Sequence, residues 1–102
     1  MQQVGNFQID RVIESETPFV ESEVFFPDFQ PEVLEQNRDW LLPRYIDEAS
    51  GKLILAMQSY VVRTGRHTIL VDACVGNDKE RRFYPPWSGL SGTRYLDGLA
   101  AI

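Results

Sequence analysis

The clearest pattern of apolar positions lies in the middle of the chain. Most residues from Leu53 to Val62 are apolar or aromatic, which predicts an interior strand with both faces largely covered. Thr64-Gly65-Arg66 follows, and its glycine suits the positive φ of a short hairpin loop. The run from His67 to Val71 predicts the second arm. Residues 53–75 are therefore expected to form a central antiparallel hairpin, which needs further packing on each face.

The amino-terminal half has a weaker pattern. Apolar and polar residues are mixed within residues 1–15, which predicts a first strand. Residues 16–52 are expected to form a mostly irregular arm, because the acidic stretch 14–23 with its proline is typical of a solvated loop. Pro31 suits the first turn of a short helix over residues 32–37. An irregular segment of this length favours contact with a substrate or another subunit.

The last third of the chain is expected to form a loop and then a helix. Residues 76–90 are predicted to be an aromatic loop, since Pro85-Pro86 exclude a regular central strand. Residues 91–102 predict the start of a helix, for which Ser91-Gly92-Thr93 offers N-cap candidates. The predicted apolar face of this helix consists of Tyr95, Leu96, Leu99 and Ala100.

Five aromatic side chains of the irregular segments have two interpretations. Packing in the core is the ordinary role of such rings, and lining a pocket or a subunit interface is the alternative. Phe26 precedes a proline, which predicts an extended backbone there. The five residues are Phe25, Phe26, Trp40, Tyr84 and Trp87.

Composition narrows the classes of function. The 102 residues allow one domain, and 43% hydrophobic with 25% charged residues are typical of a globular protein. The net charge of -5 argues against a nucleic-acid partner. We see no secretory signal and no apolar run approaching about 18 residues, so no membrane partner is expected. The single cysteine indicates no oxidising compartment, and a cytoplasmic location is the expectation.

The residues assemble no catalytic mechanism by themselves. A zinc site needs three or four ligands, and the chain has one histidine, His67. Cys74 follows an apolar strand without a CxxC partner, which favours a structural thiol over a nucleophile. Neither a nucleophile elbow nor a phosphate-binding glycine motif is present. We therefore expect no catalytic residue and no metal ligand in this chain.

Several segments together resemble the opening of metallo-β-lactamase-fold hydrolases, in particular the methyl parathion hydrolase-like branch. The most specific is Ile69-Leu70-Val71-Asp72-Ala73-Cys74-Val75-Gly76-Asn77-Asp78-Lys79. The others are Gly5-Asn6-Phe7 with Ile9-Asp10-Arg11-Val12, Phe26-Pro27-Asp28, Trp40-Leu41 and Gln58-Ser59-Tyr60-Val61-Val62.

The resemblance implies the fold and the chemistry of a longer parent protein. The fold class would be α/β, or α+β by local content, as the amino-terminal portion of an αββα sandwich. Asp72 would be the structural aspartate of the first family motif, buried and hydrogen-bonded beneath the metal site rather than a ligand. The parent would use zinc or similar divalent metals to activate a water that attacks a small-molecule ester, lactone, lactam or phosphotriester.

The His-x-His-x-Asp-His motif of that family is missing, so this chain is expected to be an inactive fragment. Half a sandwich would leave an apolar sheet face uncovered, which favours a homo-oligomer. The alternative is a small stand-alone interaction domain. It would use the aromatic arm for self-association or to bind a partner.

Overall fold

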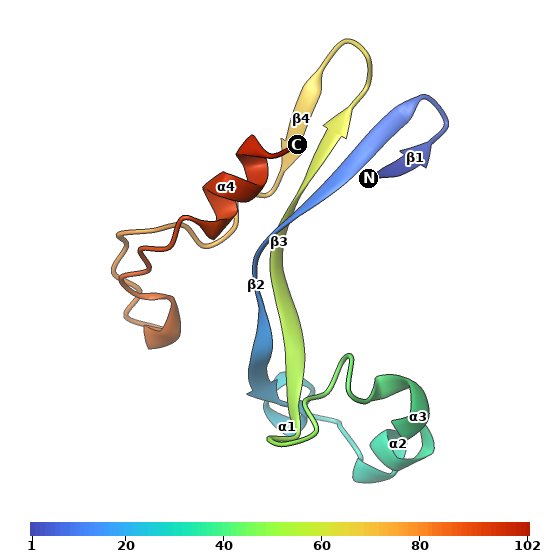
Figure 1. Ribbon diagram of the computed structural model, residues 1–102. Coiled ribbons are helices and arrows are strands. Elements are labelled where there is room, and N and C mark those ends of the chain that lie inside the picture. Colours follow the sequence, from blue (N-terminus) through green and yellow to red (C-terminus); the bar gives the residue numbers. More distant parts are fainter. The chain divides into compact units, whose positions relative to one another are not determined.

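The computed structural model describes all 102 residues as an α+β chain built on one four-stranded antiparallel sheet (Figure 1). The sheet order follows the chain: β1 (Gln2–Val4), β2 (Phe7–Glu21), β3 (Lys52–Arg63) and β4 (Thr68–Val71). The helices are α1 (Ser22–Phe25), α2 (Pro31–Gln36), α3 (Arg38–Leu41) and α4 (Arg94–Ala100), with a 3-10 turn, η1, at Pro85–Trp87. None of these helices has the length and apolar character needed to cross a bilayer.

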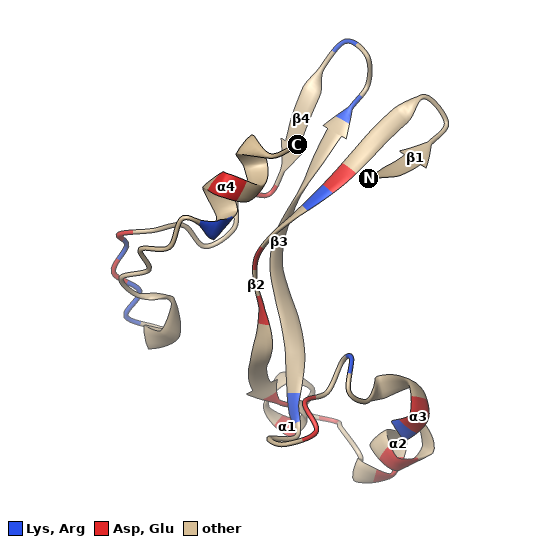
Figure 2. Cartoon of the chain, in the orientation of Figure 1, with Lys and Arg blue, Asp and Glu red and all other residues tan.

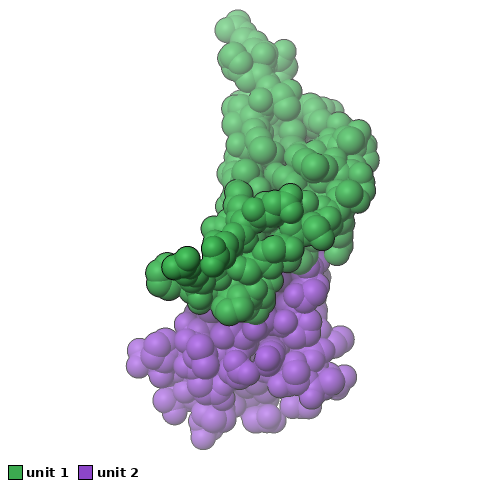
Figure 3. Space-filling view, turned by 90° about the vertical axis from the view of Figure 1, so that its left-hand side faces the viewer, with its two compact units in different colours: residues 1–15, 57–102 green, residues 16–56 purple.

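The chain divides into two compact units (Figure 3). Unit 1 comprises residues 1–15 and 57–102, and unit 2 comprises residues 16–56. β2 and β3 each contribute residues to both units. The buried apolar side chains are few: Val12, Val61 and Val75 belong to unit 1, and Ile46 belongs to unit 2.

The central hairpin is confirmed. β3 pairs with β4 in antiparallel register from Tyr60 opposite Val71 to Arg63 opposite Thr68, and Gly65 in the loop has a φ of 83°. β3 is an interior strand, because it lies between β2 and β4 in the sheet order. β4 is an edge strand, and all four of its residues are exposed.

Two expectations for the amino-terminal half are wrong. Residues 1–15 form two strands rather than one, because Gly5, with a φ of 56°, turns the chain so that Val4 pairs with Phe7. The predicted loop over residues 14–23 is mostly strand, because β2 continues to Glu21. β1 covers only the first three residues of β2, so Pro18 lies where that edge is open and its missing N–H breaks no ladder on that side.

Of the three short helices of unit 2, only α2 was predicted from the sequence. Pro31 is the first residue of α2, as predicted, and Phe26 is extended before its proline, with φ −121° and ψ 96°. The sequence did not predict α1 or α3. Asn37 separates α2 from α3, and its side-chain amide donates to the carbonyl of Val33 at 2.8 Å, which satisfies one of the last carbonyls of α2.

Helix α4 starts after Thr93, one of the predicted N-cap candidates, although no side-chain cap bond forms. The predicted apolar face is partly wrong, because the side chain of Leu96 is 62% exposed. The less exposed positions are Tyr95, Gly98 and Leu99. Gly98 sets this face: an ideal Cβ placed on it would lie 2.9 Å from Cγ1 of Val12, so only a glycine allows this approach.

We predict that Gly98→Ala lowers the free energy of unfolding by about 1–3 kcal/mol through overpacking. At an unconstrained helix position the same change would stabilise by up to about 1 kcal/mol. Urea denaturation followed by circular dichroism measures the difference. Val12→Ala provides the control, because in that background Gly98→Ala should cost nothing further. Stabilisation by Gly98→Ala alone would contradict the close approach.

Candidate functional site

A buried hydroxyl joins three segments of unit 1. Ser59 of β3 is completely buried, and its hydroxyl donates to the carbonyl of Asp72 at 2.8 Å. The same oxygen lies 2.7 Å from the hydroxyl of Tyr95 and 3.3 Å from Sγ of Cys74. A serine hydroxyl has one hydrogen to donate and two lone pairs, so Tyr95 and Cys74 act as the donors to it. Ser59 thereby uses its full hydrogen-bonding capacity.

Asp72 forms the turn that leaves β4. Its backbone has a φ of 67°, and its Oδ1 accepts the N–H of Cys74 at 2.7 Å. The predicted hydrogen bonding of Asp72 is confirmed, whereas its predicted burial is wrong, because the residue is exposed. The reason is that the backbone carbonyl of Asp72, and not its side chain, bonds the buried Ser59. The carboxylate bonds the N–H of Cys74 within the turn.

Glu14 holds the next part of the same loop. Its two carboxylate oxygens accept the backbone N–H groups of Val75 and Gly76, at 2.9 and 3.0 Å. The sequence suggested only a solvated charge at this position. The signal available was Gly76, whose φ of 79° lets two successive N–H groups turn toward one acceptor. Because the two partners are 61 and 62 residues away from Glu14, the pairing itself could not be read from local pattern.

The chemistry of this cluster is structural. Burial raises the pKa of the Cys74 thiol, and the charges of Glu14 and Asp72 also raise it. The thiol is therefore protonated at neutral pH and is a poor nucleophile. His67, the only imidazole, is exposed in the loop between β3 and β4, and no bond joins it to the cluster.

The residues of this chain do not fit the zinc centre that the resemblance implies. Nowhere do three histidine, cysteine, aspartate or glutamate side chains come together as a ligand group. A zinc site requires three or four such ligands at one point.

Unit 2 contains an apolar pocket with a volume of about 450 Å³. This volume lies within the range of small-molecule sites. Two of the five aromatic candidates, Phe26 and Trp40, line the same pocket. The complete lining consists of Ser22, Phe26, Asp28, Phe29, Gln30, Val33, Asn37, Trp40, Leu41, Ile46 and Leu53.

The other three aromatic candidates lie outside this pocket. Phe25 packs edge-on against Phe26, with ring centroids 4.9 Å apart. Tyr84 and Trp87 pack against each other in unit 1, with centroids 5.0 Å apart. The structure therefore does not gather the five rings at one place.

Hydrogen bonds fix the pocket wall. The indole N–H of Trp40 donates to Oδ1 of Asn37 at 2.9 Å, and Asn37 is itself bonded to Val33. Ile46 and Leu53 face each other across an isolated antiparallel bridge, so the turn between them positions both. These bonds indicate a pocket that is formed before any ligand arrives.

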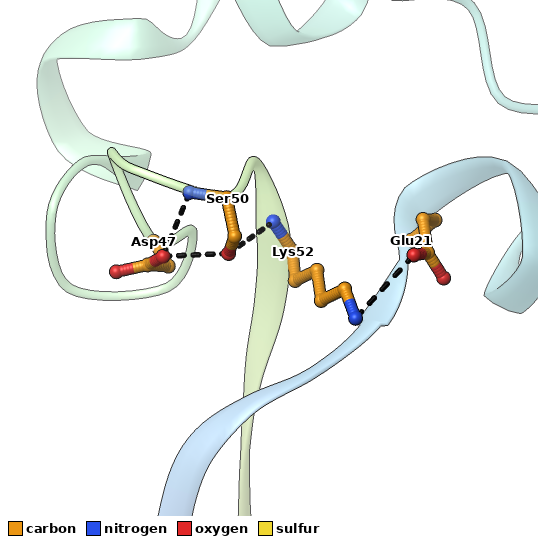
Figure 4. A network of polar contacts seen from close by, with 4 residues as sticks. All are labelled: Glu21, Asp47, Ser50 and Lys52. Carbon is orange, nitrogen blue, oxygen red and sulfur yellow. Dashed lines mark hydrogen bonds and ion pairs between the residues drawn. The ribbon is translucent and has the colours of Figure 1, made fainter.

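A polar network closes that turn (Figure 4). Oδ2 of Asp47 accepts both the N–H and the hydroxyl of Ser50, and these bonds lower the pKa of Asp47. Lys52 donates its backbone N–H to the Ser50 hydroxyl and pairs its ammonium with Glu21 at 3.5 Å. The pKa of Glu21 is also lowered, mainly by a hydrogen bond from its own backbone and then by the positive charge of Lys52.

Comparison with known proteins identifies no similar protein. No family model, curated protein or solved structure matches the chain.

We predict that Ser59→Ala lowers the free energy of unfolding by about 1–3 kcal/mol, because it leaves the Asp72 carbonyl and the Tyr95 hydroxyl without their partner. Urea denaturation measures the change. Ser91→Ala is the matched control: its exposed serine should shift stability by no more than about 0.5 kcal/mol. Equal effects of the two substitutions would contradict the role of Ser59.

A second prediction concerns pH. The bonds from Ser50 favour the carboxylate form of Asp47, so the turn is more stable above the ordinary aspartate pKa of about 3.9. That contribution is lost as the pH falls through the lowered pKa. The amide signal of Ser50, followed by NMR, should titrate with this lowered midpoint. In Ser50→Ala the Asp47 midpoint should rise toward its ordinary value, and an unchanged midpoint would contradict the assigned cause.

Proposed function

We propose that this chain is the amino-terminal, non-catalytic part of a metallo-β-lactamase-fold hydrolase. The parent enzyme would hydrolyse an ester, lactone, lactam or phosphotriester, and its metal ligands would be supplied by residues outside these 102. In this proposal the chain contributes strands of one sheet of an αββα sandwich. Asp72 contributes the structural turn at the end of one of these strands.

The observation that carries the proposal is the turn after β4. An aspartate at the end of an edge strand adopts positive φ, bonds the backbone two residues on, and starts a loop that Glu14 holds through two N–H groups. These contacts give Asp72 a structural role without a metal. The same role is implied by the resemblance of residues 69–79 to the first motif of the family.

The exposure of β4 supports the proposal. Ile69 and Leu70 are each 46% exposed and Val71 is 48% exposed. Neighbouring residues of a strand point to opposite faces, so β4 presents apolar side chains on both sides. In an αββα sandwich a strand is covered by helices on one face and by the second sheet on the other. The missing cover is what the rest of a parent domain would provide.

A second candidate function is a stand-alone interaction domain. The observation in its favour is the exposure of the aromatic arm: Phe25, Phe26 and Trp40 are 49, 52 and 60% exposed. Aromatic residues are enriched in protein interfaces. In this alternative the arm would bind a second copy of the chain or another protein.

The gene provides the first test. If the chain is part of a hydrolase, a His-x-His-x-Asp-His motif is expected within a few tens of codons after that of Ile102. The longer product should then bind zinc and hydrolyse esters or lactones, while residues 1–102 alone should bind no stoichiometric zinc. Tight binding of one or two zinc ions by residues 1–102 would contradict the proposal.

Light scattering on purified residues 1–102 separates the two candidates. A folded species of one discrete mass, together with a stop codon and no downstream motif, would overturn the hydrolase proposal in favour of the interaction domain. Aggregation that disappears in the longer product would support the hydrolase.

A further inference from the structure

The pocket of unit 2 combines aromatic walls with one charged side chain. The rings of Phe26, Phe29 and Trp40 line it together with aliphatic residues. Asp28 is the only charged residue of the lining, and it is exposed, so its carboxylate is hydrated and lies at the rim. Aromatic faces attract cations, and a carboxylate at the entrance does the same.

The charge of the whole unit has the same sign. Residues 16–56 contain nine acidic and three basic residues, a net charge of −6, whereas the remainder of the chain carries +1. Figure 2 shows acidic residues on each of α1, α2 and α3. Such a field favours approach of a cation and opposes an anion.

A buried hydroxyl in the pocket wall lacks a partner. Ser22 lines the pocket, is 3% exposed, and its Oγ has no hydrogen bond within the chain. Buried polar groups are nearly always paired, so an unpaired hydroxyl in a wall is a place where a ligand atom completes the bonding. The pocket therefore offers an anionic rim, aromatic sides and one inner polar contact to a ligand.

We propose that this pocket binds a small aromatic amine, with its ammonium beside Asp28 and its ring among Phe26, Phe29 and Trp40. A ring hydroxyl on such a ligand would bond Ser22 after a change of the serine rotamer. The proposal involves no metal and no residue outside unit 2. It therefore stands or falls independently of the hydrolase proposal.

Three probes have similar shapes and different charges, so their affinities show how much charge contributes to binding. They are 2-phenylethylamine, 2-phenylethanol and 3-phenylpropanoate. The indole N–H signal of Trp40 reports binding in the ¹⁵N-labelled protein, and that of Trp87, in unit 1, is the internal control. Trp87→Phe assigns the two signals. We expect only the Trp40 signal to move, with the amine binding about two- to fivefold tighter than the alcohol and the acid binding weakest.

Asp28→Asn tests the position of the ammonium. It should reduce the affinity for 2-phenylethylamine to that of 2-phenylethanol and leave the alcohol unchanged. Glu48→Gln is the matched control, because it removes the same charge from an exposed residue of unit 2 outside the lining. Equal effects of the two substitutions would overturn the assignment of Asp28, and equal affinities of the three probes would overturn the choice of a cation.

Tyramine, which adds a ring hydroxyl to 2-phenylethylamine, tests the inner contact. Tyramine should bind about two- to tenfold tighter than its parent amine, and Ser22→Ala should remove this advantage. No difference between the two amines would overturn the contact with Ser22. Movement of neither indole signal with any probe at millimolar concentration would overturn the pocket as a ligand site.

Discussion

The hydroxyl of Ser59 is the contact on which the arrangement of unit 1 depends. It is completely buried, and its three partners come from the turn after β4, from Cys74 and from α4. Only a few apolar side chains are buried in this chain, so apolar packing alone does little to determine how the segments of unit 1 are arranged. A buried polar group is costly unless every bond is made, and that requirement selects one position for each partner. Gly98 then permits the close approach of α4 that brings Tyr95 to Ser59.

Unit 2 is organised differently. It buries little apolar surface except around Ile46, and its rings line a pocket instead of filling a core. Its wall is held by side-chain hydrogen bonds such as the one from Trp40 to Asn37. The strong negative charge of this unit, against a nearly neutral unit 1, is consistent with a surface that selects ligands by charge. The hydrolase proposal rests on unit 1, and the amine-binding proposal rests on unit 2.

Features determined by neighbouring residues could be predicted from the sequence. The β3–β4 hairpin, the glycine of its loop and Pro31 at the start of α2 follow from local pattern. The extent of β2 could not be predicted, because the open edge that tolerates Pro18 depends on how short β1 is. The partners of Glu14 are distant in sequence, and no local rule connects them. Ser59 was a further available signal, because it and Gln58 interrupt the apolar run of an interior strand, where a buried polar residue needs a partner.

The distance in sequence between these partners has a consequence for the order of folding. The β3–β4 hairpin joins neighbours and closes on the scale of about 1–10 μs. The hydrogen bonds of Glu14 cannot form until Val75 and Gly76 have been synthesised, more than sixty residues later. At a synthesis rate of about 5–20 residues per second, this delay is of the order of seconds. During that interval the first strands have no completed sheet to join, so the nascent chain is most vulnerable to wrong pairing at its amino-terminal end.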